Sequence, residues 1–271
     1  MILMLLLAAF CASIPSHAQD GGRLPDAPRQ NLPAASKPTD KFPKSGMAEI
    51  GAITPRRSVD QNEMPWRTIG RIRAGRSSCT GALIGPALLL TAAHCVFNPE
   101  TQRLFPPQSI HFMLGYSQGR YVADAYGVRL TLSDNYDPAE PLKTVGHDWA
   151  LLELGHAIGT PGDELTLREL PPPVGARVSL GGYAQERPEV LMVDSDCRVV
   201  GTASDQTGAA LIQHDCTATH GVSGAPLLLQ EGTTWVIGGI EVIGSSDSAA
   251  GATRLDGVLA AIRQMNLSRV P

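Results

Sequence analysis

The sequence predicts an all-β protein, and three observations support that fold class. Short apolar runs follow one another from Trp66 onward, among them TIGRI, TGALIG, IHFMLG and WALLEL, and turn residues separate many of them. The chain contains 28 glycines and 21 prolines, which suits many short strands better than long helices. Only the tail, LDGVLAAIRQMNL, carries apolar residues at helical spacing.

The length and composition are those of a globular protein. A chain of 271 residues has room for one large domain or two small lobes. Hydrophobic residues make up 43% and charged residues 18%, which is ordinary for a protein with a packed core. The net charge is -4 and no long basic run occurs, so we expect no nucleic-acid partner.

Residues 1–18 have the pattern of a signal peptide. The run MILMLLLAAF is too short to span a bilayer, and Ser16-His17-Ala18 resembles a small-x-small cleavage site. No Lys or Arg precedes the apolar run, which departs from the usual pattern. We therefore expect export, into a periplasm or out of the cell, without a stable membrane anchor.

Residues 19–57 are rich in proline and polar residues and lack apolar periodicity, so they predict a disordered leader or propeptide. This segment ends at the dibasic pair Arg56-Arg57, a candidate processing point. The folded domain is then expected to cover residues 58–271.

The tail predicts a helix over about 255–267, packed on the strands through one apolar face. Thr253 and Asp256 are candidates for its N-terminal cap. The face consists of Leu255, Val258, Leu259, Ile262 and Met265.

The cysteines indicate two disulfides. Removing residues 1–18 removes Cys11 and leaves an even number of cysteines in an exported chain. Four cysteines allow three pairings, and sequence proximity favours Cys79–Cys95 and Cys197–Cys216. Zinc binding is the competing interpretation, but no C-x-x-C or H-E-x-x-H spacing occurs. We therefore expect neither a metal nor another cofactor.

Three polar residues lie in settings that suit nucleophilic catalysis. Ser223 lies in HGVSGAPLL, where its alternative is a small residue in a tight turn. His94 ends the apolar run LLLTAAHC, and Asp148 precedes another run in GHDWALLEL. Taken alone, the setting of His94 suits a buried structural histidine, and the setting of Asp148 suits an aspartate in a turn. Together they supply the base and the orienting group that a serine nucleophile needs.

Three motifs in this order resemble those of trypsin-like (chymotrypsin-fold) serine proteases: TAAHC, HDWALLEL and GVSGAPLL. The resemblance runs from about residue 58 to the C-terminus. It is strongest to secreted bacterial members, including the glutamyl-endopeptidase-like branch. It implies two six-stranded antiparallel β-barrels, over about 58–160 and 175–252, with the active site between them and a C-terminal helix.

The resemblance also implies roles for the residues. Ser223 would attack the scissile carbonyl, His94 would transfer the proton, and Asp148 would orient the imidazole. The backbone N–H groups of Gly221 and Ser223 would form the oxyanion hole. The disulfide Cys79–Cys95 would hold the turn that carries the base and contribute roughly 3 kcal/mol.

The specificity pocket departs from trypsin, which carries an Asp six positions before its nucleophile. Thr217 stands there in this chain. Glu241 either faces the pocket, where it would favour Lys or Arg in the substrate, or points to solvent. Gly244 is expected to keep the entrance open, and His220 is a candidate substrate contact. Val242 occupies the position where many relatives place a Ser near the catalytic Asp.

The sequence thus predicts an exported bacterial serine endopeptidase that acts on protein or peptide substrates as a monomer. A catalytically silent binding protein on the same fold is the alternative. An esterase using the same triad is a third interpretation, although the chain lacks a G-x-S-x-G elbow.

Overall fold

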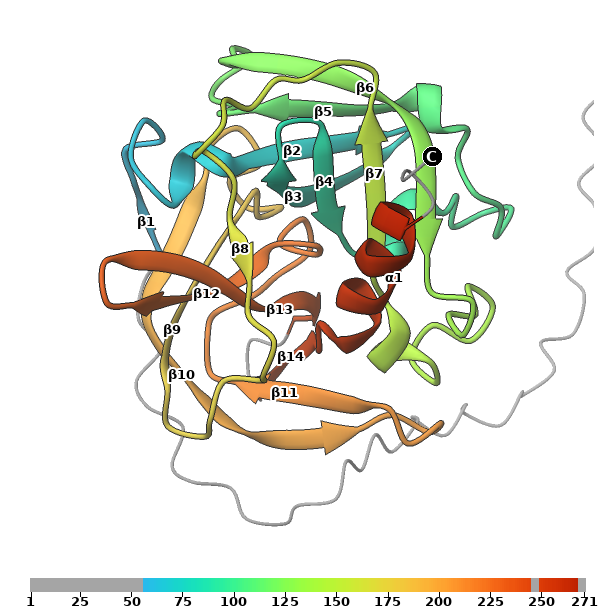
Figure 1. Ribbon diagram of the computed structural model, residues 1–271, viewed down its shortest axis with the longest axis vertical. Coiled ribbons are helices and arrows are strands. Elements are labelled where there is room, and N and C mark those ends of the chain that lie inside the picture. Colours follow the sequence, from blue (N-terminus) through green and yellow to red (C-terminus); the bar gives the residue numbers. More distant parts are fainter. Residues whose placement is uncertain (1–55, 245–248, 268–271) are drawn as a thin grey trace, which may run out of the picture. The chain divides into compact units, whose positions relative to one another are not determined.

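The structure, a computed structural model, describes residues 56–244 and 249–267 (Figure 1). The predicted signal peptide and nearly all of the predicted leader lie outside these ranges. No helix among the described residues is long and apolar enough to cross a membrane.

The first barrel closes in the order β2-β3-β4-β7-β6-β5, with every neighbouring pair antiparallel. Its strands are β2 (Ile69–Ala74), β3 (Ser77–Gly85), β4 (Leu88–Thr91), β5 (Ile110–Leu114), β6 (Ala123–Leu132) and β7 (Ala150–Leu154). Short 3₁₀ helices connect or precede these strands at Trp66–Thr68, Ala93–Val96, Pro107–Ser109 and Val145–His147.

Strands β4 and β7 are mostly apolar because both of their faces are largely buried. Leu89 pairs with Leu152, and both point into the barrel interior. The next pair, Leu90 and Leu151, instead joins a core shared by both barrels. Alternate residues of one strand therefore serve two different cores.

The second barrel contains β9 (Arg177–Gly182), β10 (Met192–Ser204), β11 (Ala210–His214), β12 (Pro226–Glu231), β13 (Thr234–Ile243) and β14 (Ala250–Thr253). It runs β10-β11-β14-β13-β12-β9 and closes by pairing β9 with β10. The prediction of two six-stranded antiparallel barrels is confirmed.

Two short strands extend the second sheet. β1 (Arg57–Ser58) pairs with β10, so the first described residues join the C-terminal barrel although they precede the N-terminal one. β8 (Thr166–Leu167) pairs in parallel with β13. It lies within the segment that connects the barrels in sequence.

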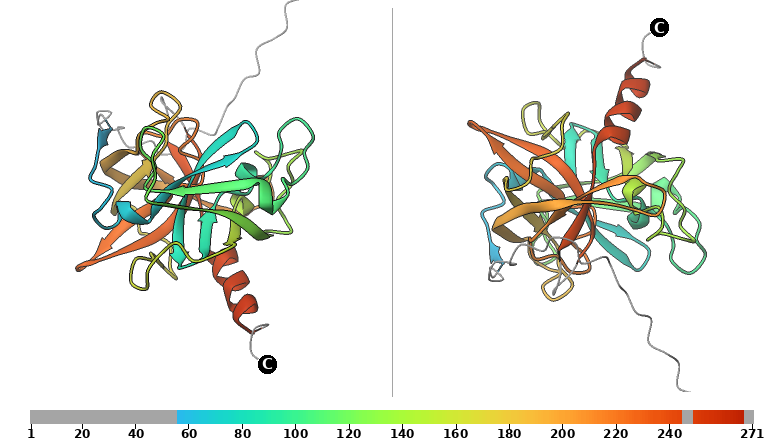
Figure 2. Two further views of the ribbon diagram at one scale, coloured as in Figure 1. Left: turned by 90° about the horizontal axis from the view of Figure 1, so that it is seen from above. Right: turned by 90° about the horizontal axis from the view of Figure 1, so that it is seen from below.

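Helix α1 (Asp256–Leu267) begins against the barrels and runs outward (Figure 2). Leu255 and Val258 are buried in the shared core with Trp149, as the apolar face predicts. A Cβ at Gly257 would lie 2.7 Å from the indole nitrogen of Trp149, so this first turn packs closely on the loop before β7. Thr253 is not part of the helix cap, because it lies in β14.

Candidate active site

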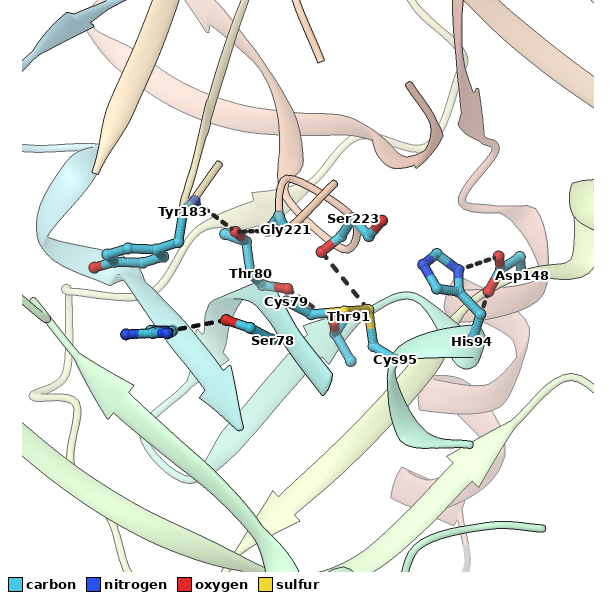
Figure 3. Close-up of a disulfide and its surroundings, with 11 residues drawn as sticks. Ser78, Cys79, Thr80, Thr91, His94, Cys95, Asp148, Tyr183, Gly221 and Ser223 are labelled. Atoms are coloured by element: carbon cyan, nitrogen blue, oxygen red, sulfur yellow. Dashed lines mark hydrogen bonds and ion pairs between the residues drawn. A yellow bond between two sulfur atoms is a disulfide. The ribbon is translucent and has the colours of Figure 1, made fainter. Parts of the chain in front are cut away.

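The candidate base, His94, lies on the 3₁₀ turn Ala93–Val96 that directly follows β4. The disulfide Cys79–Cys95 joins this turn to β3, with a Cα–Cα distance of 6.0 Å (Figure 3). The apolar strand and the disulfide together fix the backbone that carries the imidazole. The side chain itself remains 32% exposed.

The candidate orienting carboxylate, Asp148, ends the 3₁₀ turn Val145–His147 immediately before β7. Its backbone N–H donates to the Val145 carbonyl at 3.2 Å. The side chain is 3% exposed. A carboxylate buried in this way needs hydrogen-bond donors to remain ionised.

Asp148 finds two such donors on one residue. His94 Nδ1 lies 2.6 Å from Asp148 Oδ2, and the His94 backbone N–H donates to Oδ1 at 2.9 Å. Burial disfavours the charged imidazole, but the charge and hydrogen bond of Asp148 outweigh it, so the pKa of His94 is raised above 6.5. This arrangement orients the ring and leaves Nε2 on its far side.

Ser223 lies in a loop whose backbone needs two glycines. Gly221 has φ +91° and Gly224 has φ +81°. A Cβ on Gly221 would overlap the carbonyl of Tyr183, and one on Gly224 would overlap Thr91 and Thr80. Figure 3 shows the imidazole of His94 between Ser223 and Asp148, although no hydrogen bond joins the serine hydroxyl to the ring. Such bonds are often long in unliganded enzymes.

Thr80 fastens the serine loop to the first barrel, a role that sequence reasoning missed. Its backbone N–H donates to the Ser223 carbonyl at 2.9 Å, and its hydroxyl donates to the Gly221 carbonyl at 2.8 Å. The same hydroxyl accepts the N–H of Tyr183 at 3.0 Å. These bonds hold the Gly221–Val222 peptide, while the His220–Gly221 peptide, which carries the Gly221 N–H, is held through its carbonyl by the N–H of Gln185 at 2.7 Å. Neither the Gly221 nor the Ser223 N–H donates to an acceptor within the described residues.

Comparisons with known proteins identify the family and the fold. The family model for trypsin matches residues 53–262. The chain belongs to the trypsin family. A glutamyl endopeptidase from Bacillus licheniformis is 26% identical over 160 residues, which cover 57% of this chain and 48% of that protein. The match therefore spans about half the length of this curated relative.

A solved structure of a Glu endopeptidase in complex with MPD has the same fold as this member of the trypsin family. It matches with a TM-score of 0.67 at 21% sequence identity, covering 81% of this chain and 99% of that one. The resemblance to the glutamyl-endopeptidase branch is thus confirmed at the level of family and fold.

Among the residues considered for the specificity pocket, Glu241 does not point to solvent, which was one of its two predicted orientations. It is 1% exposed and lies inside the second barrel, where its Oε2 is 2.7 Å from Nε2 of the fully buried His214. The carboxylate expected to attract Lys or Arg is therefore already paired. The sequence did not reveal His214 because the pairing of β11 with β14 and β14 with β13 brings it near Glu241.

Gly244, which was expected to keep the entrance open, is exposed but lies close to backbone of the loop before Ser223. A Cβ there would lie 2.6 Å from the Ala218 carbonyl oxygen, so backbone of the two pocket walls is in close contact. Val242 packs against the interior cluster of the first barrel. Its side chain is apolar, so it offers no hydroxyl at the position where many relatives have a Ser.

The two remaining pocket candidates lie on the loop before Ser223. Thr217 is partly buried, and its backbone N–H donates to Asp194 Oδ2 at 2.9 Å. It follows Cys216, which forms a disulfide with Cys197 of β10. His220 has an exposed side chain, and its carbonyl accepts the N–H of Gln185 at 2.7 Å. Of these two, His220 has the more accessible side chain.

The dibasic pair is part of the folded domain. The Arg56 side chain is 9% exposed, forms an ion pair with Glu186 and donates to Thr219 Oγ1 at 3.2 Å. Burial lowers the pKa of Arg56, and Asp194 partly opposes that change. Arg57 lies in β1, so cleavage beside it would cut a paired strand. Processing proteases prefer exposed loops, so this position is a poor processing point once the domain is folded.

Two other features of the described residues do not add to the site. Cys79, His94 and Cys95 have ligand atoms within 4.8 Å of one another, but both sulfurs belong to the disulfide and offer no thiolate. A cavity of about 520 Å³ contains no predicted site residue. It is lined by Arg57, Val59, Trp66, Arg177, Ser179, Ser195, Leu228, Gln230 and Trp235.

Proposed function

We propose that this chain is an exported serine endopeptidase that uses His94, Asp148 and Ser223. The observation that carries the proposal is the imidazole of His94, held on one side by the buried Asp148 and facing Ser223 on the other. Membership of the trypsin family supports the reaction class. The two disulfides support export, since such bonds persist in oxidising compartments.

In the first half of the reaction, Ser223 Oγ attacks the carbonyl carbon of the substrate peptide bond while His94 Nε2 takes the hydroxyl proton. The oxyanion that forms accepts hydrogen bonds from the N–H groups of Gly221 and Ser223. One oxyanion donor contributes about a hundredfold to a thousandfold in rate in comparable enzymes. His94 then gives its proton to the departing amine, which leaves an ester on Ser223.

In the second half, water attacks that ester and His94 takes a proton from the water. Collapse of the tetrahedral species releases the acid product, and the proton returns to Ser223 Oγ. Throughout, Asp148 stays ionised and holds Nδ1 protonated, so Nε2 is the nitrogen that exchanges protons.

The competing proposal is a catalytically silent binding protein, and one observation favours it. Gly244 lies against Ala218, and Glu241 is paired inside the barrel. With its carboxylate beside His214, Glu241 is not free to pair with a cationic substrate side chain. An active enzyme would have to recognise its substrate through other groups.

Labelling with a fluorophosphonate probe tests the two proposals on the full-length protein. We expect the label on Ser223, found by mass spectrometry, and no label in His94→Ala. A folded protein without label would overturn the endopeptidase proposal in favour of the binding protein. Comparison of peptide and ester substrates on protein that takes the label then separates an endopeptidase from an esterase, which would cleave only the esters.

A further inference from the structure

The turn that carries Asp148 belongs to the first barrel but is held by the second. Asp205 Oδ2 accepts the backbone N–H of Gly146 at 2.9 Å. From β14, the buried hydroxyl of Thr253 donates to the carbonyl of Val145 at 2.8 Å. Both contacts lie within three residues of Asp148, on peptide groups of its 3₁₀ turn.

Asp205 is itself rigidly held at the hairpin between β10 and β11. Its Oδ1 accepts the Thr207 N–H at 2.8 Å, the Thr207 hydroxyl at 2.6 Å and the Ala209 N–H at 3.0 Å. Burial acts against the charged carboxylate, but these bonds and the Gly146 N–H outweigh it, so the pKa of Asp205 is lowered. One carboxylate thus joins the hairpin tip to the Asp148 turn through four donors.

The contact between hairpin and turn requires a close approach of backbone. A Cβ on Gly146 would lie 2.6 Å from Cβ of Ala209 and 3.0 Å from Asp205 Oδ2. Glycine is therefore the residue that fits at this position. Beside it, His147 Nε2 lies 3.4 Å from the Thr207 hydroxyl and adds a weak contact between the same two elements.

We propose that Asp205 is a positioning residue that holds the Asp148 carboxylate in register with His94. This inference rests on the proposed function. Without the Asp205 contact, the turn that carries Asp148 would lose one of its hydrogen bonds to the second barrel. Ser223 belongs to that barrel, so the position of Asp148 and His94 relative to Ser223 would be less well fixed. A displacement of about 1 Å can cost about a hundredfold in rate when it misaligns catalytic groups.

The test is Asp205→Asn in the full-length protein, because asparagine keeps the size but has only one accepting oxygen. We expect kcat for a peptide substrate to fall about tenfold to hundredfold with KM unchanged. The downfield proton resonance of His94 Nδ1–H should also shift or broaden, a change that a general loss of stability does not produce. The milder Thr207→Val removes one donor to Asp205 and should lower kcat about twofold to fivefold.

Asp60→Asn is the matched control, because Asp60 Oδ1 also accepts a backbone N–H two residues ahead, at 2.8 Å, in a turn of its own. It should leave both readouts unchanged. An unaltered kcat and His94 resonance in folded Asp205→Asn would overturn the inference, as would a loss confined to KM. If Asp205→Asn does not fold, Thr207→Val decides the question by the same two measurements. An inactive parent protein would instead overturn the proposed function.

Discussion

Two histidine–carboxylate pairs lie near the loop that carries Ser223, and their separations are almost equal. His94 Nδ1 and Asp148 Oδ2 are 2.6 Å apart, and His214 Nε2 and Glu241 Oε2 are 2.7 Å apart. Their surroundings differ. The His94 side chain is 32% exposed, whereas His214 and Glu241 are sealed in the second barrel at 0% and 2%.

Hydrogen bonding separates the pairs further. Asp148 receives both the ring and the backbone N–H of His94. In the sealed pair, none of the four polar atoms meets hydrogen-bond geometry with a partner in the described ranges. The pair to which we assign catalysis therefore differs from the sealed pair not in distance but in two other features. Its carboxylate has a second donor, and its histidine keeps an accessible ring nitrogen on the far side.

Activity should depend on the two carboxylates very unequally. Asp148→Asn should lower kcat by about 10⁴, because an amide no longer selects the tautomer with a proton on Nδ1. Glu241→Gln should lower kcat by less than about tenfold, since Glu241 acts on His94 only through its charge. Steady-state kinetics with one peptide substrate checks both. Comparable losses would refute the functional distinction between the pairs.

Stability should follow the opposite order. Glu241→Ala leaves the buried His214 without its partner, and an unsatisfied buried polar group costs about 1 to 3 kcal/mol in the free energy of unfolding, to which the void left by the shorter side chain adds. Asp148→Ala should cost less, because His94 can be hydrated through its exposed side. Urea denaturation measures both.

The control for this comparison is Glu140→Ala, which breaks a surface pair with Lys143 whose side chains are 55% and 45% exposed. It should change the unfolding free energy by no more than about 0.5 kcal/mol. If Asp148→Ala proved more destabilising than Glu241→Ala, the view of the second pair as the structural one would have to be abandoned.

The pH dependence should distinguish the pairs as well. The proposed mechanism needs a neutral His94, so activity should be lost as the pH falls through the pKa of His94, which lies above 6.5. Burial lowers this pKa, whereas Asp148 is the main group that raises it and Glu241 a smaller one. Asp148→Asn should therefore move the acid limb of the kcat profile to lower pH, and Glu241→Gln should move it less in the same direction. A shift to higher pH in either variant would contradict the assigned electrostatics.

The sequence predicted an all-β fold and the terminal helix because their signals are local: apolar runs with turn residues mark strands, and helical spacing marks the tail. The two six-stranded barrels came from the family resemblance, which rests on the three motifs around His94, Asp148 and Ser223. Contacts such as His214–Glu241 and Asp205–Gly146 depend on strand pairing and on barrel-to-barrel approach, which leave no short motif. Thr253 illustrates the limit: its position suggested a helix cap, but its hydroxyl binds Val145, 108 residues away.

Replacing the whole sealed pair should have a smaller effect than removing Glu241 alone. In His214→Leu/Glu241→Met, no unpartnered polar group remains, and apolar side chains of similar size keep the barrel filled. Replacement of a buried ion pair by apolar residues is often neutral or stabilising. We therefore expect the free energy of unfolding of the double variant to lie within about 2 kcal/mol of the parent value and above that of Glu241→Ala. The double variant should also retain most of its kcat. Urea denaturation and peptide hydrolysis on one preparation measure both quantities. If the double variant folded but lost activity as Asp148→Asn does, the sealed pair would belong to the catalytic machinery. Its polar groups would then be needed for the reaction, and a purely structural role for the pair would have to be abandoned.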